Sequence, residues 1–202
     1  MVLTLWKVSP VGDVIATYSA SQSAPALINA ISANASGVSL VGSLQEKPFI
    51  QSLTAQGVFG KLISIGTSKS SLNAIVRQSD GTLSVFGTSA ETLGGKKLAG
   101  IRDGILIKIS KTGAVASVVR SSAPKADRSW IGADSTLALT GFVKTGKVIE
   151  TTFTKFTSAT TIGDTSYDVH ERPSDGTLFF GPDNDTDALT YGQIAHAKDR
   201  IA

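Results

Sequence analysis

The stretch Ile107-Lys108-Ile109-Ser110-Lys111-Thr112-Gly113-Ala114-Val115 decides the fold, because the chain contains it more than once. Near the N-terminus, Trp6-Lys7-Val8-Ser9-Pro10-Val11-Gly12-Asp13-Val14 places Lys, a β-branched residue, Ser and Gly at the same relative positions. Ile50–Val58 is a looser copy, and Thr154–Thr160 is a fourth copy that has lost its glycine. Internal repetition of this kind indicates a fold assembled from similar units.

Two further elements recur around these copies. Ile28–Ile31 reappears as Leu72–Ile75, and Asp80-Gly81-Thr82-Leu83 reappears as Asp175-Gly176-Thr177-Leu178. The strand expected to close each unit ends in glycine, at Gly42, Gly87, Gly141 and Gly181. Successive glycines are therefore 45, 54 and 40 residues apart (42 to 87, 87 to 141, 141 to 181). A period of this length is typical of a propeller blade.

Within a unit the pattern predicts β-strands. Polar and apolar residues alternate, and Gly-containing turns separate the alternating runs. In the first unit we expect strands at about 5–9, 14–19, 27–33 and 38–44. A helical period of 3.6 residues is almost absent, so a doubly wound α/β fold is excluded. We therefore predict an all-β, β-propeller-like chain with four blade-like repeats of four short antiparallel strands. A large β-sandwich is the alternative.

The predicted units cover about 3–45, 46–90, 103–145 and 147–182, and residues 1–182 form the repeat domain. The remaining residues, 183–202, are an acidic turn and a C-terminal tail. That tail is expected to form either a short helix or a partial strand, with Leu189–His196 opening a further blade.

Composition limits the classes of function. The 202 residues carry a net charge of +3 and no cysteine, which excludes disulfides and a thiol nucleophile. Residues 1–163 hold 16 basic and 8 acidic residues, whereas residues 164–202 hold 3 and 8. The basic residues are mostly isolated and lack interleaved aromatics, so we expect no nucleic-acid binding. No apolar run is long enough for a membrane span, and the N-terminus does not resemble a signal peptide.

The repeats resemble a known family. The pattern combines Leu106–Gly113, Asn73–Ile75 and Asp80–Gly87, with a junction from Gly87-Thr88-Ser89 across an insertion to Asp103–Lys108. It is similar to the β-propeller repeats of exported bacterial proteins, over residues 3 to about 181. The resemblance implies a scaffold of six to eight blades on cell surfaces or in secreted proteins, mostly without assigned activity. Four units depart from that blade number.

The segment Gly181–Asp187 is the strongest metal candidate. Asp183, Asp185 and Asp187 alternate as they do in a calcium loop. The loop's sixth position, however, is Ala188 instead of glycine, and its twelfth is Ile194 instead of a bidentate acid. We therefore favour a solvated turn and predict no metal and no cofactor.

Other candidate residues do not form a recognisable catalytic set. Asp168 and His170 share one face of a predicted strand, where a surface ion pair is favoured over a general base. Gly94-Gly95-Lys96-Lys97 lacks the spacing of a phosphate loop and is interpreted as a flexible insertion between blades. Trp6 and Trp130 are expected to pack between blades. The remaining acids are far apart in the sequence and show no glycosidase-like pairing: Glu46, Glu91, Asp127 and Glu150.

The sequence thus favours a non-catalytic scaffold or binding module from an exported or cell-envelope bacterial protein, with an unknown protein or glycan as partner. Self-association is expected if the ring is incomplete. The alternative is an enzyme of the same fold, a lyase or glycan hydrolase whose acids converge at the channel mouth. Carboxylates or histidines at that mouth would favour the enzyme, whereas Ser, Thr and Ala would favour the scaffold.

Overall fold

The computed structural model describes residues 3–20, 26–121, 124–134, 137–155, 167–171 and 178–182. These residues form strands, turns and loops, with no helix among them, so the all-β prediction is confirmed. None of the described residues belongs to a helix of the length and apolarity needed to cross a bilayer.

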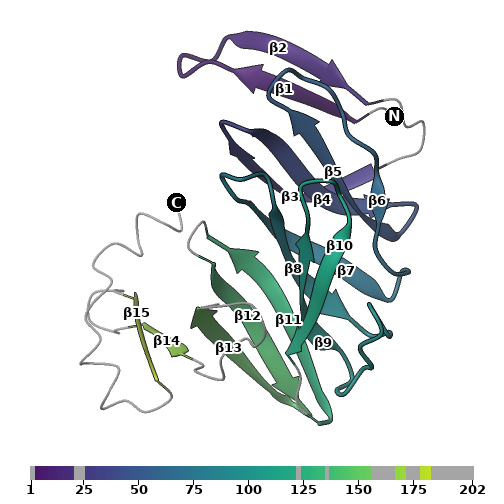
Figure 1. Ribbon diagram of the computed structural model, residues 1–202. Coiled ribbons are helices and arrows are strands. Elements are labelled where there is room, and N and C mark those ends of the chain that lie inside the picture. The colour runs from purple at the N-terminus through teal and green to yellow at the C-terminus, as the bar shows by residue number, and fades with distance from the viewer. Residues whose placement is uncertain are drawn as a thin grey trace.

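Four antiparallel sheets make up the fold (Figure 1). Sheet I contains β1 (Thr4–Val8) and β2 (Val14–Ser19). Sheet II contains β3 (Ala26–Asn34), β4 (Gly37–Leu44), β5 (Lys47–Thr54) and β6 (Ile63–Ser64). Sheet III contains β7 (Ser70–Arg77), β8 (Leu83–Ser89), β9 (Asp103–Ile109) and β10 (Val115–Ser121). Sheet IV contains β11 (Ala126–Ala133), β12 (Ala138–Thr145), β13 (Val148–Lys155), β14 (Tyr167–Glu171) and β15 (Leu178–Pro182).

The sheets follow one another along the chain, and in each sheet consecutive strands pair. The first strand of sheets III and IV lies across the preceding sheet, because β7 contacts β3 and β4, and β11 contacts β7, β8 and β9. The sheet boundaries are offset from the sequence units. The unit expected at 3–45 gives its first two strands to sheet I and its last two to sheet II.

Two apolar clusters hold the stack together. One joins Val41 and Ile50 of sheet II to one face of sheet III, including Ile107. The other joins the opposite face of sheet III, with Leu106, to Trp130 of sheet IV. Sheet III is therefore covered on both faces by different sheets, whereas a two-sheet sandwich covers only one face of each. Burying an aliphatic side chain fully contributes roughly 1.5–3 kcal/mol, so these clusters are the main stabilising contacts between sheets.

The recurring glycines face a recurring irregularity. Gly42, Gly87 and Gly141 on the second strand of sheets II, III and IV oppose Ile28, Leu72 and Trp130, and the register shifts just after each opposing residue. A Cβ atom at any of the three glycines would collide with a backbone carbonyl oxygen on the first strand. Glycine is required here because the bulged strand approaches too closely for a side chain.

Two expectations from the sequence are wrong. Residues 87–103 do not pass from one blade to the next, because β8 and β9 pair within sheet III from Leu83↔Ile109 to Ser89↔Asp103. The insertion therefore lies within sheet III and not between blades, and in it Leu93 and Lys96 exchange backbone hydrogen bonds around Gly94 and Gly95. Trp6 does not pack between sheets and is 66% exposed, whereas the matching expectation for Trp130 is confirmed at 2% exposed.

Candidate functional site

The bulges of sheets II and III each place an asparagine between neighbouring sheets. Asn29 is the extra residue between Ile28 and Ala30, and its Nδ2 donates to the Leu72 carbonyl oxygen over 2.7 Å. Asn73 occupies the same place on β7, and its Nδ2 donates to the Trp130 carbonyl oxygen over 2.8 Å. A bulge re-aims the extra residue, which explains why these side chains reach sideways instead of lying above their own sheet.

This pair of asparagines was not identified from the sequence as functional. The signal was the recurrence of Asn-Ala-Ile at 29–31 and 73–75, opposite Gly42 and Gly87. In sheet IV the bulged position is Ile131, which has no donor and is 53% exposed. The asparagine bridges therefore run from sheet II to III and from III to IV.

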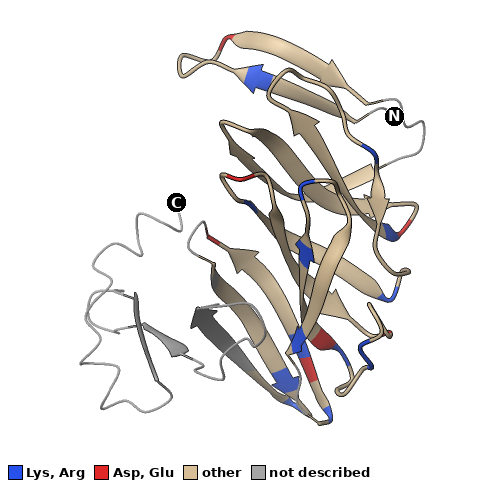
Figure 2. Ribbon diagram, viewed as in Figure 1, with Lys and Arg blue, Asp and Glu red and all other residues tan. Residues whose placement is uncertain are grey.

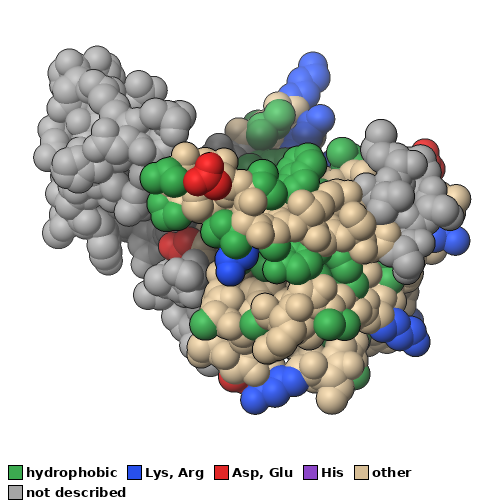
Figure 3. Space-filling view, turned by 90° about the horizontal axis from the view of Figure 1, so that it is seen from above, with side chains coloured by type: hydrophobic (Ala, Val, Ile, Leu, Met, Phe, Trp, Pro, Cys, Tyr) green, Lys and Arg blue, Asp and Glu red, His purple; other side chains and the backbone are tan. Residues whose placement is uncertain are grey.

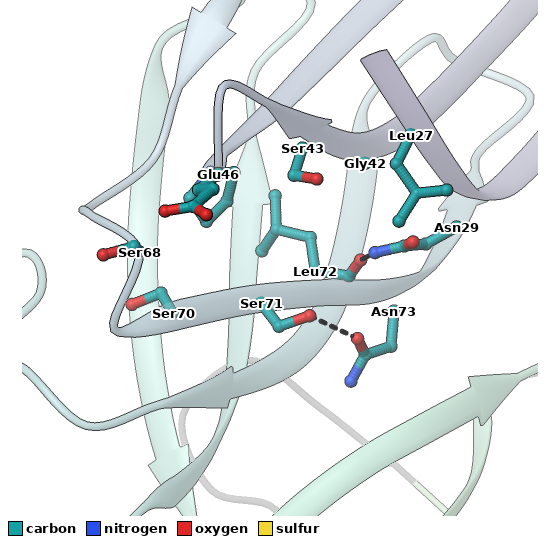
Figure 4. Close-up of a pocket in the computed structure, with 11 residues that line it drawn as sticks. Leu27, Asn29, Gly42, Ser43, Glu46, Ser68, Ser70, Ser71, Leu72 and Asn73 are labelled. Atoms are coloured by element: carbon teal, nitrogen blue, oxygen red, sulfur yellow. Dashed lines mark hydrogen bonds between the residues drawn. The ribbon is translucent and has the colours of Figure 1, made fainter. Parts of the chain in front are cut away.

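A groove opens beside the Asn29 bridge, between the ends of sheets II and III (Figure 4). Its volume is about 510 Å³. Its polar walls consist of hydroxyl and amide side chains together with one carboxylate, Glu46. The polar lining residues are Asn29, Ser43, Glu46, Ser68, Ser70, Ser71 and Asn73. Ser71 Oγ donates to Asn73 Oδ1 over 2.7 Å, so the groove and the Asn73 bridge share a hydrogen-bond network.

Glu46 reaches the groove from a strained turn. Leu44 pairs with Lys47, which leaves a two-residue hairpin loop of Gln45 and Glu46. Their φ angles are 49° and 65°, in the left-handed region that two-residue hairpins require and that Asn-Gly fills best. Two residues other than glycine in this region cost roughly 1–2 kcal/mol each. Strain of this kind commonly marks residues whose side chains serve a function.

Glu91, by contrast, fastens the adjacent loop. Its carboxylate accepts from Thr67 N over 2.7 Å and from Ser70 Oγ over 2.6 Å. Burial alone would raise the pKa of Glu91. The hydrogen bonds from Ser70 and Thr67, with the positive charge of Lys69, outweigh burial and hold that pKa below its usual value. Glu91 thus stays ionised as the acceptor that positions Ser70 at the edge of the groove.

Two aspartates form ion pairs at the same end of sheet III, where Asp103 lies in register with Ser89 and Ser70. Figure 2 shows acidic and basic positions close together on the ribbon in this part of the molecule. Asp103 is fully buried and accepts from Arg120 Nε over 2.8 Å and from the Gly100 amide over 2.8 Å. Asp127 on β11 forms a two-point pair with Arg102, with distances of 2.8 and 2.5 Å. These carboxylates tie a loop to sheet III and sheet III to sheet IV.

The acids singled out in the sequence whose side chains are described have three different roles. Glu46 lines the groove, Glu91 anchors a loop and Asp127 holds two sheets together. The side chains of Glu150, Asp168 and His170, and the whole of Asp183, Asp185 and Asp187, lie outside the described residues. Within the described ranges, no group of three or more acids or histidines is placed to hold a metal ion.

Comparisons with known proteins assign no family. No protein-family model matches the chain, and no curated protein matches it. Among solved structures, it is similar to a crystal structure of a protein of unknown function from Bacteroides caccae, with 9% sequence identity and a TM-score of 0.40. The match covers 87% of this chain and 70% of the other.

Proposed function

We propose that the chain is a non-catalytic scaffold or binding module of the β-propeller type, in which its small sheets stack around an axis. Two observations support this arrangement: the first strand of sheets III and IV packs across the preceding sheet, and the same bulge recurs on the first strand of sheets II, III and IV. The proposal that it belongs to an exported or cell-envelope bacterial protein rests on the resemblance of its repeats.

The groove between sheets II and III is the proposed binding surface. The observation that carries this proposal is its lining, in which serines and asparagines occur together with a single acidic residue, Glu46. Hydroxyl and amide groups both donate and accept hydrogen bonds, so they suit a hydroxyl-rich glycan or a polar protein segment. A glycoside hydrolase of the usual two-carboxylate type would need a second carboxylate beside the first, and Glu46 is the only acid among the described lining residues.

The strained turn supports the same assignment. Gln45 and Glu46 keep an unfavourable backbone where Asn-Gly would be relaxed, and this turn places the exposed residue Glu46 in the lining of the groove. A backbone that is fixed before binding reduces the ordering that this residue needs when a ligand donates to its carboxylate. We therefore assign Glu46 as the main acceptor for a donor group of the ligand.

The test is a titration of the 15N-labelled chain with neutral oligosaccharides and polar peptides, followed by NMR. We expect amide shifts at 43–46 and 68–73, and about tenfold weaker binding for Glu46→Gln, since a hydrogen bond to a charged group contributes roughly 1.5–3 kcal/mol. The control is Lys111→Gln, in an exposed turn outside the groove lining. Shifts confined to other residues would overturn the site, and cleavage of a titrated oligosaccharide would overturn the non-catalytic assignment.

A further inference from the structure

Sheet I contains sequence copies of only two of the four strands that sheet III contains. By the repeat, Trp6–Val14 corresponds to Ile107–Val115, so β1 and β2 match β9 and β10, the third and fourth strands of sheet III. In sheet III, β9 pairs with β10 on one edge and with β8 on the other. Among the described strands, β1 pairs with β2 alone. The edge of β1 that corresponds to the β8 side of β9 is therefore open.

One face of sheet I is also uncovered. Trp6 and Val8 match Ile107 and Ile109, which are 0% and 1% exposed, but they are themselves 66% and 52% exposed. Val14, on the same face, is 60% exposed. Hydrophobic side chains gather at this end of the molecule in Figure 3, which views sheet I from above. An open strand edge beside an apolar face is an interaction surface.

The β14–β15 hairpin corresponds to the two strands that sheet I lacks. Asp175–Leu178 repeats Asp80–Leu83, the turn between β7 and β8, so the β14–β15 hairpin corresponds to the first two strands of a sheet. Its present attachment is slight: β14 joins β13 through the single register pair Phe153↔Tyr167, whereas β12 and β13 pair from Ala138 to Thr145.

We propose that the β14–β15 hairpin of the same chain docks on sheet I, with β15 pairing along the open edge of β1. The product is a four-stranded sheet in the order β14-β15-β1-β2, the order seen in sheets II and III. The hairpin gives up its one pair with β13 and gains a ladder with β1. This proposal rests on the propeller arrangement proposed above. Docking of the hairpin on sheet I would join the last sheet of the chain to the first and close the ring of sheets, and this step is called closure below.

The outer face of sheet IV fits this closure. It exposes Ile131 and Ile149, which are 53% and 65% exposed, and Ile149 pairs with Lys144 across β12 and β13. Sheets III and IV each bury one face against the preceding sheet, as sheet III does with Ile107 and sheet IV with Trp130. The Trp6 face of the completed sheet is thus the surface that would cover sheet IV.

The pairing of β8 with β9 sets the expected register. Leu83 pairs with Ile109, and these residues correspond to Leu178 and Val8. The chain has no cysteine, so a pair of introduced cysteines gives an unambiguous result. Leu178–Gly181 is one residue shorter than Leu83–Gly87, and a register set by the glycine would instead pair Leu178 with Lys7.

The experiment is mild oxidation of the full chain carrying Val8→Cys with Leu178→Cys, or Lys7→Cys with Leu178→Cys, at low protein concentration. We expect one of these pairs to form an intrachain disulfide in most molecules, identified by peptide mass spectrometry. The control, Val11→Cys with Leu178→Cys, places the first cysteine in the turn of the same hairpin, where it is 84% exposed, and should stay reduced.

Acrylamide quenching gives an independent measurement on the chain without cysteines. Trp130 is buried, so the difference between the wild type and Trp6→Phe reports on Trp6. If the hairpin docks on sheet I and covers Trp6, acrylamide should quench the fluorescence of Trp6 several-fold less than that of a free tryptophan derivative. An interchain disulfide would overturn the proposal in favour of a second copy. Absence of both disulfides with a readily quenched Trp6 would overturn it in favour of another partner for β15, such as Leu189–His196. Neither result affects ligand titration of the groove.

Discussion

Sheets III and I carry the same repeat but differ in what surrounds it. In sheet III, Leu106 and Ile107 point to opposite faces and both are fully buried, one against sheet IV and the other against sheet II. In sheet I, the matching Leu5 is half-buried and Trp6 is exposed. The same local sequence thus makes the same hairpin, while burial is decided by the position of the sheet in the stack.

This difference indicates which sheets contribute most to the stability of the molecule. A strand pair gains little from its own hydrogen bonds, because folding exchanges them for bonds to water at a net of roughly 0.5–1.5 kcal/mol each. Covering both faces with apolar side chains supplies the larger contribution. Sheet III is therefore expected to be the most stable part of the molecule, and sheet I the part most dependent on an added partner.

The largest expected effect comes from a charge placed in the doubly covered sheet. Leu106→Asp should lower the free energy of unfolding by about 4 kcal/mol or more, because a carboxylate would enter an apolar layer without a partner. A loss of this size is at the upper end of the range for point substitutions. Leu5→Asp, at the matching position of sheet I, should cost about 1–2 kcal/mol. Urea denaturation of both variants measures the difference, and equal losses would refute the contrast between the sheets.

The buried ion pair at the end of sheet III is next. Asp103→Asn should cost about 3–5 kcal/mol, because it leaves Arg120 buried without its charged partner. The exposed pair of Asp80 and Lys111 is the comparison, with Lys111 Nζ 3.9 Å from Asp80 Oδ2. Lys111→Gln should change the free energy of unfolding by less than about 1 kcal/mol. Thermal unfolding of the two variants provides the comparison. An Asp103→Asn variant as stable as the wild type would mean that the hydrogen bonds from the Gly100 amide and from Arg120 to Asp103 do not stabilise the loop.

Repetition and alternation were enough to predict the all-β class and the strands of the first sheets. The first predicted strand at 5–9 lies one residue from β1, and the second matches β2. Grouping of strands into sheets was less accessible, because a repeat fixes the period but not where each unit begins. The junction at Gly87 was misassigned for this reason, since only the register with β9 places both strands in sheet III.

The groove could not have been located from the sequence. Its walls come from β3, β4, β7 and the turns beside them, and only the packing of sheet II on sheet III brings Asn29 close to Ser71. The asparagines were visible as a repeat, but their role depends on the bulge that turns each of them toward the next sheet. Glu46 carries no sequence signal, because Gln-Glu is not a typical two-residue hairpin loop.

A smaller effect is expected at the bulges. Gly87→Ala should cost roughly 1–3 kcal/mol, because the added Cβ would collide with the Ser71 carbonyl oxygen and push two paired strands apart. Gly60→Ala is the control, since its Cβ would lie 3.5 Å from the nearest described atom and its φ is not left-handed. Chemical denaturation distinguishes them. Equal stability of the two variants would show that the bulge relaxes around a methyl group.

The smallest effect is a pH dependence located beside the groove. Because hydrogen bonds hold the pKa of Glu91 below its ordinary value of 4.5, its stabilising contribution is complete above that value and is lost as the pH falls through the lower pKa of the folded chain. Glu91 is partly exposed, so screening by solvent limits the effect to about a few tenths of a kcal/mol.

Melting temperatures of the wild type and Glu91→Gln between pH 7 and pH 3 test this contribution. The difference between them should be constant down to about pH 5 and then shrink, because protonation removes the charge that the substitution removes at every pH. A difference that stays constant to pH 3 would show that Glu91 positions Thr67 and Ser70 without its charge. In that event the edge of the groove, like the interior of sheet III, would depend on packing and neutral hydrogen bonds alone.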